Sequence, residues 1–94
     1  MAKIFVLRKA NRDLLNLIKG NAKVVLLQDG VYLLVGKGRE TIAALSGEGV
    51  EFHVFEPDSV KRGISGKIPG YINRVNLHDL VQLIMDKGYK VINL

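Results

Sequence analysis

The residues with the clearest potential for chemistry follow an apolar run at 24–27, Val-Val-Leu-Leu. Gln28, Asp29 and Gly30 come directly after this run, and Val31 begins the next one. Four consecutive large apolar residues predict a strand that is buried on both faces. In an open parallel α/β sheet, ligands and partners are met at the carboxyl ends of the strands. We therefore take these four residues as the first candidates for a pocket or a partner interface.

Simpler structural roles are also open to these residues. Asp29 can cap a helix that follows it, and Gly30 can permit a tight turn. Gln28 ends a buried strand, so its polar groups need hydrogen-bond partners. The sequence leaves both the structural role and the partner contact open at this turn.

The content of cysteine and histidine restricts the possible chemistry. None of the 94 residues is a cysteine, which excludes disulfides, thiolate ligands and thiol-based mechanisms within this chain. His53 and His78 fall on different predicted elements, which disfavours a zinc site. Glu56 and Asp58 flank a proline, and we expect them to form a turn rather than an acid–base pair. We predict no catalytic residue, no metal and no cofactor, and catalysis by the commonest nucleophile, base or metal routes has little to work with in this chain.

The chain is basic, with a formal net charge of +5. A basic surface attracts nucleic acid or an acidic protein, although a surplus of charge for solubility explains the same number and is slightly favoured. No aromatic residues alternate with the basic ones, as base stacking would require. The candidates for contact with RNA or an acidic partner are Arg8, Lys9, Arg12, Lys61 and Lys67.

Strands and helices are predicted to alternate along the chain. The predicted strands are 3–7, 23–27, 51–55, 71–75 and 90–94, and the predicted helices are 11–18, 31–35, 40–45, 59–62 and 77–87. For residues 31–35 a strand competes with the helix, and we choose the helix because a hairpin would interrupt the alternation. This order predicts the α/β class, as a three-layer α/β/α sandwich with a five-stranded, mainly parallel sheet in one domain, 1–94.

Three polar residues are predicted to cap helices, namely Asn11, Asp58 and Asn76. Gly63 is predicted to end the short helix after Asp58. The inward apolar stripe of the first helix is predicted to contain Leu14, Leu15, Leu17 and Ile18. The inward stripe of the last helix is predicted to contain Leu77, Leu80, Val81 and Ile84, with Lys87 in its final turn.

The apolar runs are short throughout. The longest, 31–35, is far below the roughly 18 residues of a membrane span. The amino terminus lacks the apolar core of a signal peptide, so we expect a cytoplasmic protein that does not contact the membrane. Helices in so short a chain cannot fully cover a five-stranded sheet, and uncovered apolar surface usually forms an interface, so we also expect an oligomer.

Three stretches of the sequence carry a resemblance to a known family. The apolar strand and Gln-Asp-Gly turn at 24–31, the strand, Pro-Asp start and Arg-Gly end at 54–66, and the helix start at 76–81 occur in matching order. In these features the chain resembles the DsrE/DsrF/DsrH superfamily, specifically the DsrH/TusB branch. The resemblance adds Arg62 and Gly63 to the interface candidates, although a solvated helix end and its stop would account for both residues.

The resemblance implies a role in sulfur relay. Members of the superfamily form hetero-oligomers in which DsrE/DsrF-like or TusC/TusD-like subunits are the partners, and a partner cysteine carries sulfur as a persulfide. The sulfur passes towards 2-thiolation of the tRNA wobble uridine or along a dissimilatory pathway. Some DsrH members have a cysteine in the first helix, where this chain has residues 13–17 without one. The chain thus resembles the cysteine-free TusB type, a non-catalytic subunit that meets tRNA at most indirectly.

Other functions stay open at this point. A stand-alone homo-oligomer of the same fold would explain the resemblance without a sulfur-carrying partner. A basic module that binds tRNA directly is a further alternative, based on the net charge. A small enzyme or nucleotide-binding protein that uses Gln28, Asp29 and Gly30 ranks last.

Overall fold

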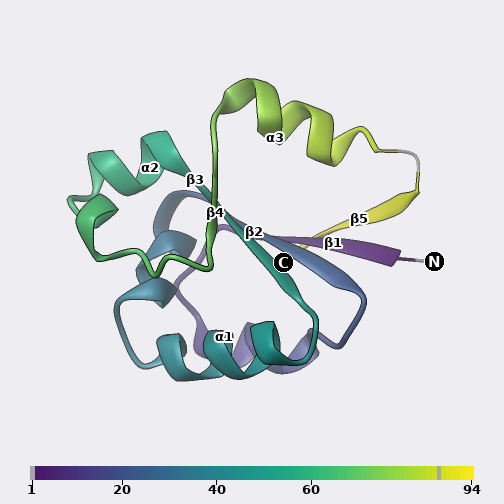
Figure 1. Cartoon of the computed structure of the whole chain (residues 1–94), viewed down its shortest axis with the longest axis horizontal. Coiled ribbons are helices and arrows are strands. Elements are labelled where there is room, and N and C mark those ends of the chain that lie inside the picture. The colour runs from purple at the N-terminus through teal and green to yellow at the C-terminus, as the bar shows by residue number, and fades with distance from the viewer. Residues whose placement is uncertain (1, 87) are drawn as a thin grey trace.

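A single five-stranded sheet forms the centre of the protein, as seen in a computed structural model that describes residues 2–86 and 88–94. The strands are β1 (Ala2–Leu7), β2 (Ala22–Leu26), β3 (Glu51–Phe55), β4 (Asn73–Val75) and β5 (Tyr89–Asn93). All neighbours pair in parallel, in the order β4-β3-β2-β1-β5 (Figure 1). The predicted α/β class with a five-stranded parallel sheet is confirmed.

Within the described residues, six helical segments connect the strands. The 3₁₀ segments are η1 (Arg12–Leu17), η2 (Gln28–Leu34) and η3 (Ser65–Lys67), and the α-helices are α1 (Gly38–Gly47), α2 (Glu56–Lys61) and α3 (Leu77–Ile84). The helical prediction for residues 31–35 is confirmed by η2, which begins three residues earlier than expected. In the described part of the chain, no helix has the length and apolar character needed to span a membrane.

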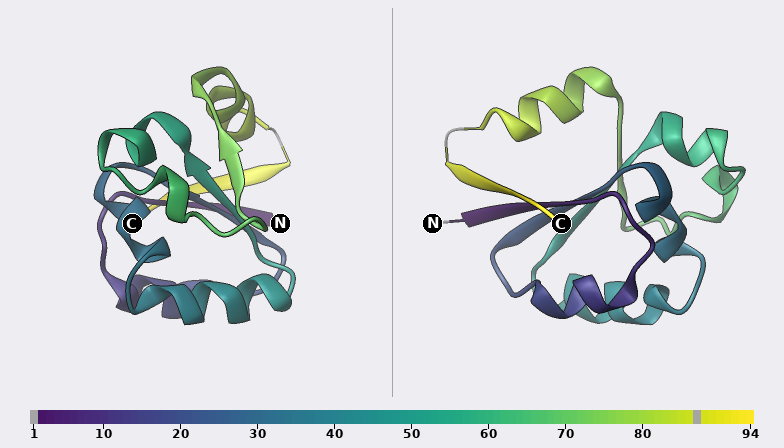
Figure 2. Two further views of the ribbon diagram at one scale, coloured as in Figure 1. Left: turned by 60° about the vertical axis from the view of Figure 1, so that its left-hand side comes forward. Right: turned by 180° about the vertical axis from the view of Figure 1, so that it is seen from behind.

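The helices α1 and α3 lie on opposite sides of the sheet (Figures 1 and 2). We call the side that carries Phe5, Val24 and Phe52 the α1 face, and it packs against apolar residues of η1, η2 and α1. We call the side that carries Ile4 and Val25 the α3 face, and it packs against α3. Successive strand residues alternate between the faces, so both cores come from the same apolar runs.

Two of the three predicted caps are confirmed. The Oδ1 atom of Asn11 accepts a hydrogen bond from the backbone N–H of Asp13 at 3.0 Å, and that of Asn76 accepts one from Asp79 at 2.8 Å. The prediction for Asp58 is wrong, because β3 runs directly into α2 and Asp58 lies inside the first turn. Glu56 likewise lies in this helix and not in a turn. Gly63 ends α2 with a φ of 71°, in the left-handed region that favours glycine.

Both predicted inward stripes are partly wrong. In η1, Leu15 and Ile18 are buried but Leu17 is 57% exposed, because a 3₁₀ segment repeats every three residues instead of 3.6. In α3, Leu80 is buried, whereas Leu77 and Val81 point outward. The predicted position of Lys87 lies outside the described residues, and α3 ends at Ile84. The periodicity therefore identified each helix without fixing which side faces the sheet.

Candidate functional site

The predicted turn after β2 lies beside the start of α2, at the carboxyl edge of the sheet. Gln28 opens η2 with a φ of 50°, which turns the chain sharply out of the strand. Its backbone N–H donates a hydrogen bond of 2.6 Å to the Oδ2 atom of Asp58. The carboxylate that was expected to cap its own helix thus satisfies the start of η2 instead. The polar group of Gln28 that finds a partner here is the backbone N–H.

Arg62 connects the same two segments. Its Nε atom donates to Oδ1 of Asp29 at 3.1 Å, and its Nη1 atom lies 3.5 Å from Oδ1 of Asp58. The Arg62 side chain is 18% exposed, whereas that of Asp29 is 67% exposed. One guanidinium therefore joins carboxylates from η2 and α2, and the interface candidates Asp29 and Arg62 are brought together in space.

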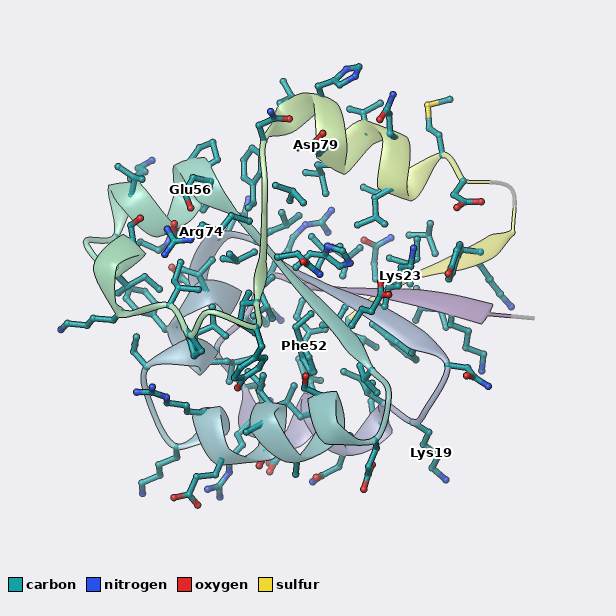
Figure 3. The ribbon with its side chains drawn as sticks, viewed as in Figure 1. Lys19, Lys23, Phe52, Glu56, Arg74 and Asp79 are labelled. Carbon is teal, nitrogen blue, oxygen red and sulfur yellow. The ribbon has the colours of Figure 1, made fainter. Side chains whose placement is uncertain are left out.

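A second polar cluster lies nearby and includes residues that the sequence did not single out together. The Nη1 atom of Arg74 donates to both carboxylate oxygens of Glu56 at 3.2 Å, and these two side chains meet in Figure 3. Arg74 also donates to the hydroxyl of Ser65 at 2.9 Å and to its carbonyl at 2.7 Å. The hydroxyl of buried Ser59 donates to the Glu56 carbonyl at 2.8 Å. Only the pairing of β3 with β4 places Arg74 beside Glu56, so local sequence carried no signal for it.

Gly30 and Val31 have structural roles in this arrangement. A Cβ on Gly30 would overlap the carbonyl oxygen of Leu7, so only glycine allows η2 to approach the end of β1 this closely. The side chain of Val31 is fully buried in the α1 face core. The surface of this edge is therefore formed by Gln28, Asp29 and Gly63, with Arg62 half-buried behind them.

The charged side chains at the carboxyl edge pair with one another. The two arginines of this edge, Arg62 and Arg74, are each held by a carboxylate. Within 2–86 and 88–94, no group of three His, Asp or Glu side chains is arranged to hold a metal ion. What the edge offers is a rigid polar surface whose shape is fixed by charge-assisted hydrogen bonds.

The predicted basic contacts lie at two separate places, and all five are exposed. Arg8, Lys9 and Arg12 lie on the connection after β1 and the start of η1, whereas Lys61 and Lys67 flank the end of α2 and η3. A groove of about 490 Å³ is lined by Arg12 of the first group, together with Tyr32 and Lys37 among others. Asp13 lines the same groove, which reduces its positive charge.

His53 is the buried titratable group of the sheet, on the α3 face. It is 9% exposed, and both ring nitrogens lack a hydrogen-bond partner among the described residues. Burial lowers the pKa of His53 below its ordinary value of 6.5; Glu51 opposes this shift and Lys23 adds to it. The Nε2 atom lies 3.6 Å from Oε2 of Glu51, which is too long for a hydrogen bond. His53 is therefore an uncharged interior histidine at neutral pH.

Comparisons with known proteins give one family and one fold. The family model described as "DsrH like protein" matches residues 6–89. A solved structure of a protein of unknown function from Methanobacterium thermoautotrophicum is 15% identical in sequence, with a TM-score of 0.76. That match covers 99% of this chain and 98% of the other. A comparison with curated proteins found no match.

Proposed function

We propose that this chain, which belongs to the DsrH family, is a non-catalytic subunit of a hetero-oligomer that relays sulfur between proteins. The observation that carries the proposal is a family match over residues 6–89 in a chain without cysteine. The partners are subunits of the DsrE/DsrF or TusC/TusD type. The chain shapes the assembly, while a partner holds the sulfur.

The division of labour follows from the chemistry of sulfur transfer. A protein accepts sulfur as a persulfide when one of its thiolates attacks the sulfur donor, so the acceptor needs a cysteine. This sequence offers none. The thiolate of the relay must therefore come from another subunit.

The outer side of α3 offers an apolar surface for such a partner. Leu77, Val81 and Met85 are 64%, 45% and 73% exposed, and their spacing of four residues places them along one side of the helix. We call these three residues the α3 stripe. An exposed apolar side of an amphipathic helix is one of the common elements of protein recognition. In the proposed assembly, the α3 stripe packs against a partner subunit.

Purification of the tagged chain from its own cells at low salt, followed by mass spectrometry, tests the assembly. We expect small cysteine-bearing proteins of the same fold to elute with it. The variant Leu77→Ser/Val81→Ser/Met85→Ser should lose them, whereas a control with exposed apolar residues changed elsewhere, Val60→Ser/Tyr71→Ser, should keep them. Recovery of the chain alone as a homo-oligomer would contradict the proposal. Partner loss only in the control would move the interface away from α3.

The sulfur step has its own test. The purified assembly is incubated with a cysteine desulfurase and ³⁵S-cysteine, and the subunits are then separated without reductant. We expect label on a partner and none on this chain. Label that this chain accepts and passes on by itself would overturn the non-catalytic role.

We propose 2-thiolation of the tRNA wobble uridine as the destination of the sulfur. Deletion of the gene should then remove 2-thiouridine from digested tRNA, as measured by liquid chromatography and mass spectrometry. Unchanged 2-thiouridine together with lost sulfur oxidation would instead assign the dissimilatory pathway.

A second candidate function is direct binding of tRNA. The observation that favours it is the groove that places Arg12 and Lys37 beside the exposed ring of Tyr32. Asp13 in the same groove opposes a phosphate, so this function ranks second. Filter binding of tRNA that weakens with added salt and with Arg12→Gln would support it. Absence of salt-dependent binding would remove it.

A further inference from the structure

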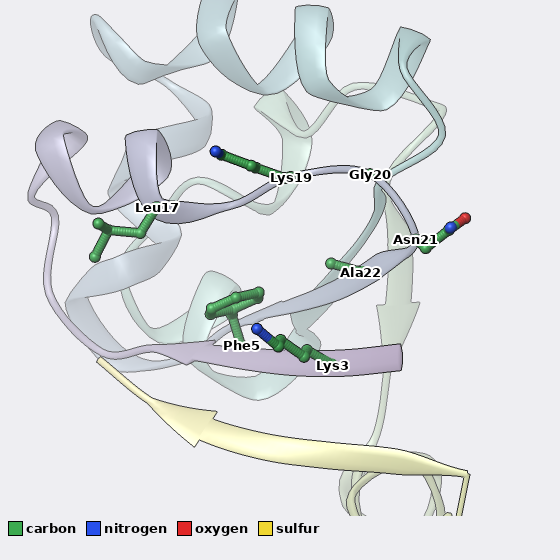
Figure 4. Close-up of a pocket in the computed structure, with 7 residues that line it drawn as sticks. All are labelled: Lys3, Phe5, Leu17, Lys19, Gly20, Asn21 and Ala22. Atoms are coloured by element: carbon green, nitrogen blue, oxygen red, sulfur yellow. The ribbon is translucent and has the colours of Figure 1, made fainter. Parts of the chain in front are cut away.

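A hollow of about 320 Å³ lies on the α1 face, away from the carboxyl edge and from the α3 stripe. It opens between the start of β1 and the segment that joins η1 to β2 (Figure 4). Asn21 adopts a left-handed conformation with a φ of 65°, which turns the chain from this segment into β2. The volume of the hollow is near the lower limit of about 300 Å³ for small-molecule sites.

The lining of the hollow combines positive charge with apolar surface. Lys3 and Lys19 contribute the charge, and Phe5, Leu17 and Ala22 contribute the apolar surface. In Figure 4 the two lysine side chains extend to the same side as Leu17, the ring of Phe5 lies beside Lys3, and the side chain of Asn21 points the other way. No carboxylate belongs to the lining.

The lysines of the hollow are available for a ligand. Neither Lys3 nor Lys19 forms an ion pair with a described residue, in contrast to Lys23, which lies 3.8 Å from Glu51. Lys90 is the β5 register partner of Lys3 and adds a third positive charge on the same face of the sheet. Like charges held near one another are relieved by an anion. Leu17 is 57% exposed at this site, although a leucine normally gains by burial.

We propose that this hollow binds a small organic anion, a phosphate or carboxylate attached to one short aromatic or aliphatic group. The charged group lies between the amino groups of Lys3 and Lys19, and the apolar group covers the Phe5 ring and Leu17. Both parts are needed, because surface lysines alone hold a free anion weakly in salt. This site is independent of the sulfur-relay role, and its test needs no partner subunit.

Nuclear magnetic resonance titration of the ¹⁵N-labelled chain tests the proposal with four probes. Phenyl phosphate and phenylacetate carry both parts, inorganic phosphate carries the charge alone, and benzyl alcohol carries the ring alone. We expect saturable shifts of the amide signals of Lys3, Phe5 and residues 19–22 with phenyl phosphate or phenylacetate. The affinities of the two single-part probes should be lower by about tenfold or more. Comparison of the two complete probes distinguishes a phosphate ligand from a carboxylate ligand.

Variants locate the binding. Lys3→Gln/Lys19→Gln should weaken the better probe about tenfold, since two charge-assisted contacts are lost. Lys3→Arg/Lys19→Arg should retain most of the affinity. The control Arg39→Gln/Lys61→Gln removes the same charge from exposed positions outside the hollow and should leave binding unchanged. A dispersed amide spectrum confirms that each variant folds.

Three results would overturn the proposal. The first is the absence of shifts with either complete probe at about 10 mM, a concentration that reveals even weak binding. The second is equal affinity for inorganic phosphate and phenyl phosphate, which would indicate a surface charge effect only. The third is unchanged affinity in Lys3→Gln/Lys19→Gln.

Discussion

The α1 face of the sheet is covered by three helical segments, whereas the α3 face is covered by one helix of eight residues. Residues on the α1 face, such as Leu7 and Leu26, are fully buried. On the α3 face, Phe55, Tyr89 and Val91 are only partly buried, and His53 lies among them without hydrogen-bond partners. The difference indicates that the α1 face supplies most of the stability of the isolated chain. In the proposed assembly, the less covered α3 face leaves surface for a partner.

The largest effect is expected where η2 meets β1 behind the α1 face. Gly30→Ala would place a methyl group on the Leu7 carbonyl, which rotation of a side chain cannot relieve. We expect a loss of about 3 kcal/mol or more in the free energy of unfolding, at the upper end for overpacked sites. Urea denaturation followed by circular dichroism measures it.

Gly66→Ala is the matched control for this substitution. A Cβ at Gly66 meets nothing within 4 Å, so the free energy of unfolding should stay within about 0.5 kcal/mol of the original value. Equal stability of Gly30→Ala and Gly66→Ala would contradict the tight approach of η2 and with it the contrast between the faces.

The second effect concerns the α3 face and depends on pH. The folded-state pKa of His53 lies below the 6.5 of the unfolded chain, so protons bind more readily to the unfolded state between these two values. The contribution of His53 to the free energy of unfolding is therefore fully present above pH 6.5. It falls as the pH drops below that value. The slope contributed by one histidine is at most about 1.4 kcal/mol per pH unit. Burial sets the lower end of this window by lowering the folded-state pKa of His53, while Glu51, which faces the imidazole, raises that pKa and Lys23 lowers it further.

The comparison is made between His53→Phe and the exposed-site control His78→Gln. Free energies of unfolding at several pH values between about 7.5 and 5 should show a shallower acid slope in His53→Phe only. If both variants kept the slope of the original chain, other groups would be responsible for acid sensitivity. A steeper slope in His53→Phe would mean that protonated His53 stabilises the fold.

Much of this contrast could be predicted from sequence, because it depends on local patterns. The apolar run at 24–27 predicted a buried strand, residues 51–55 were predicted as a further strand, and Asn11 and Asn76 predicted the starts of η1 and α3 correctly. The limited helical cover of the sheet followed from chain length alone. These properties are set by neighbouring residues and by the alternation of strands and helices.

What could not be predicted depends on contacts between distant segments. Asp58 is a good cap by type, yet the start of η2, thirty residues earlier, takes its carboxylate. The sequence allows Gly30 either a tight turn or a partner contact, whereas the constraint in the structure is the Leu7 carbonyl on a neighbouring strand. Val81 has the spacing of a core residue, but the rotation of α3 over the sheet turns it outward. In each case tertiary packing decides between roles that local sequence allows equally.

The smallest effect is expected at the carboxyl edge, which joins the α1 side to α2 without involving α3. Arg62→Met removes the contacts with Asp29 and Asp58 and should lower the free energy of unfolding by about 1 kcal/mol, since Asp29 is mostly exposed and water replaces the lost partner. The neighbouring Lys61 forms no ion pair with a described residue. The control Lys61→Met should therefore change the free energy of unfolding by less than about 0.5 kcal/mol. A double-mutant cycle with Asp29→Asn should give a coupling of about 0.2–1 kcal/mol that shrinks in 1 M salt. A loss as large as that of Gly30→Ala would make the carboxyl edge a main source of stability, and the contrast between the two faces would no longer describe how the chain is held together.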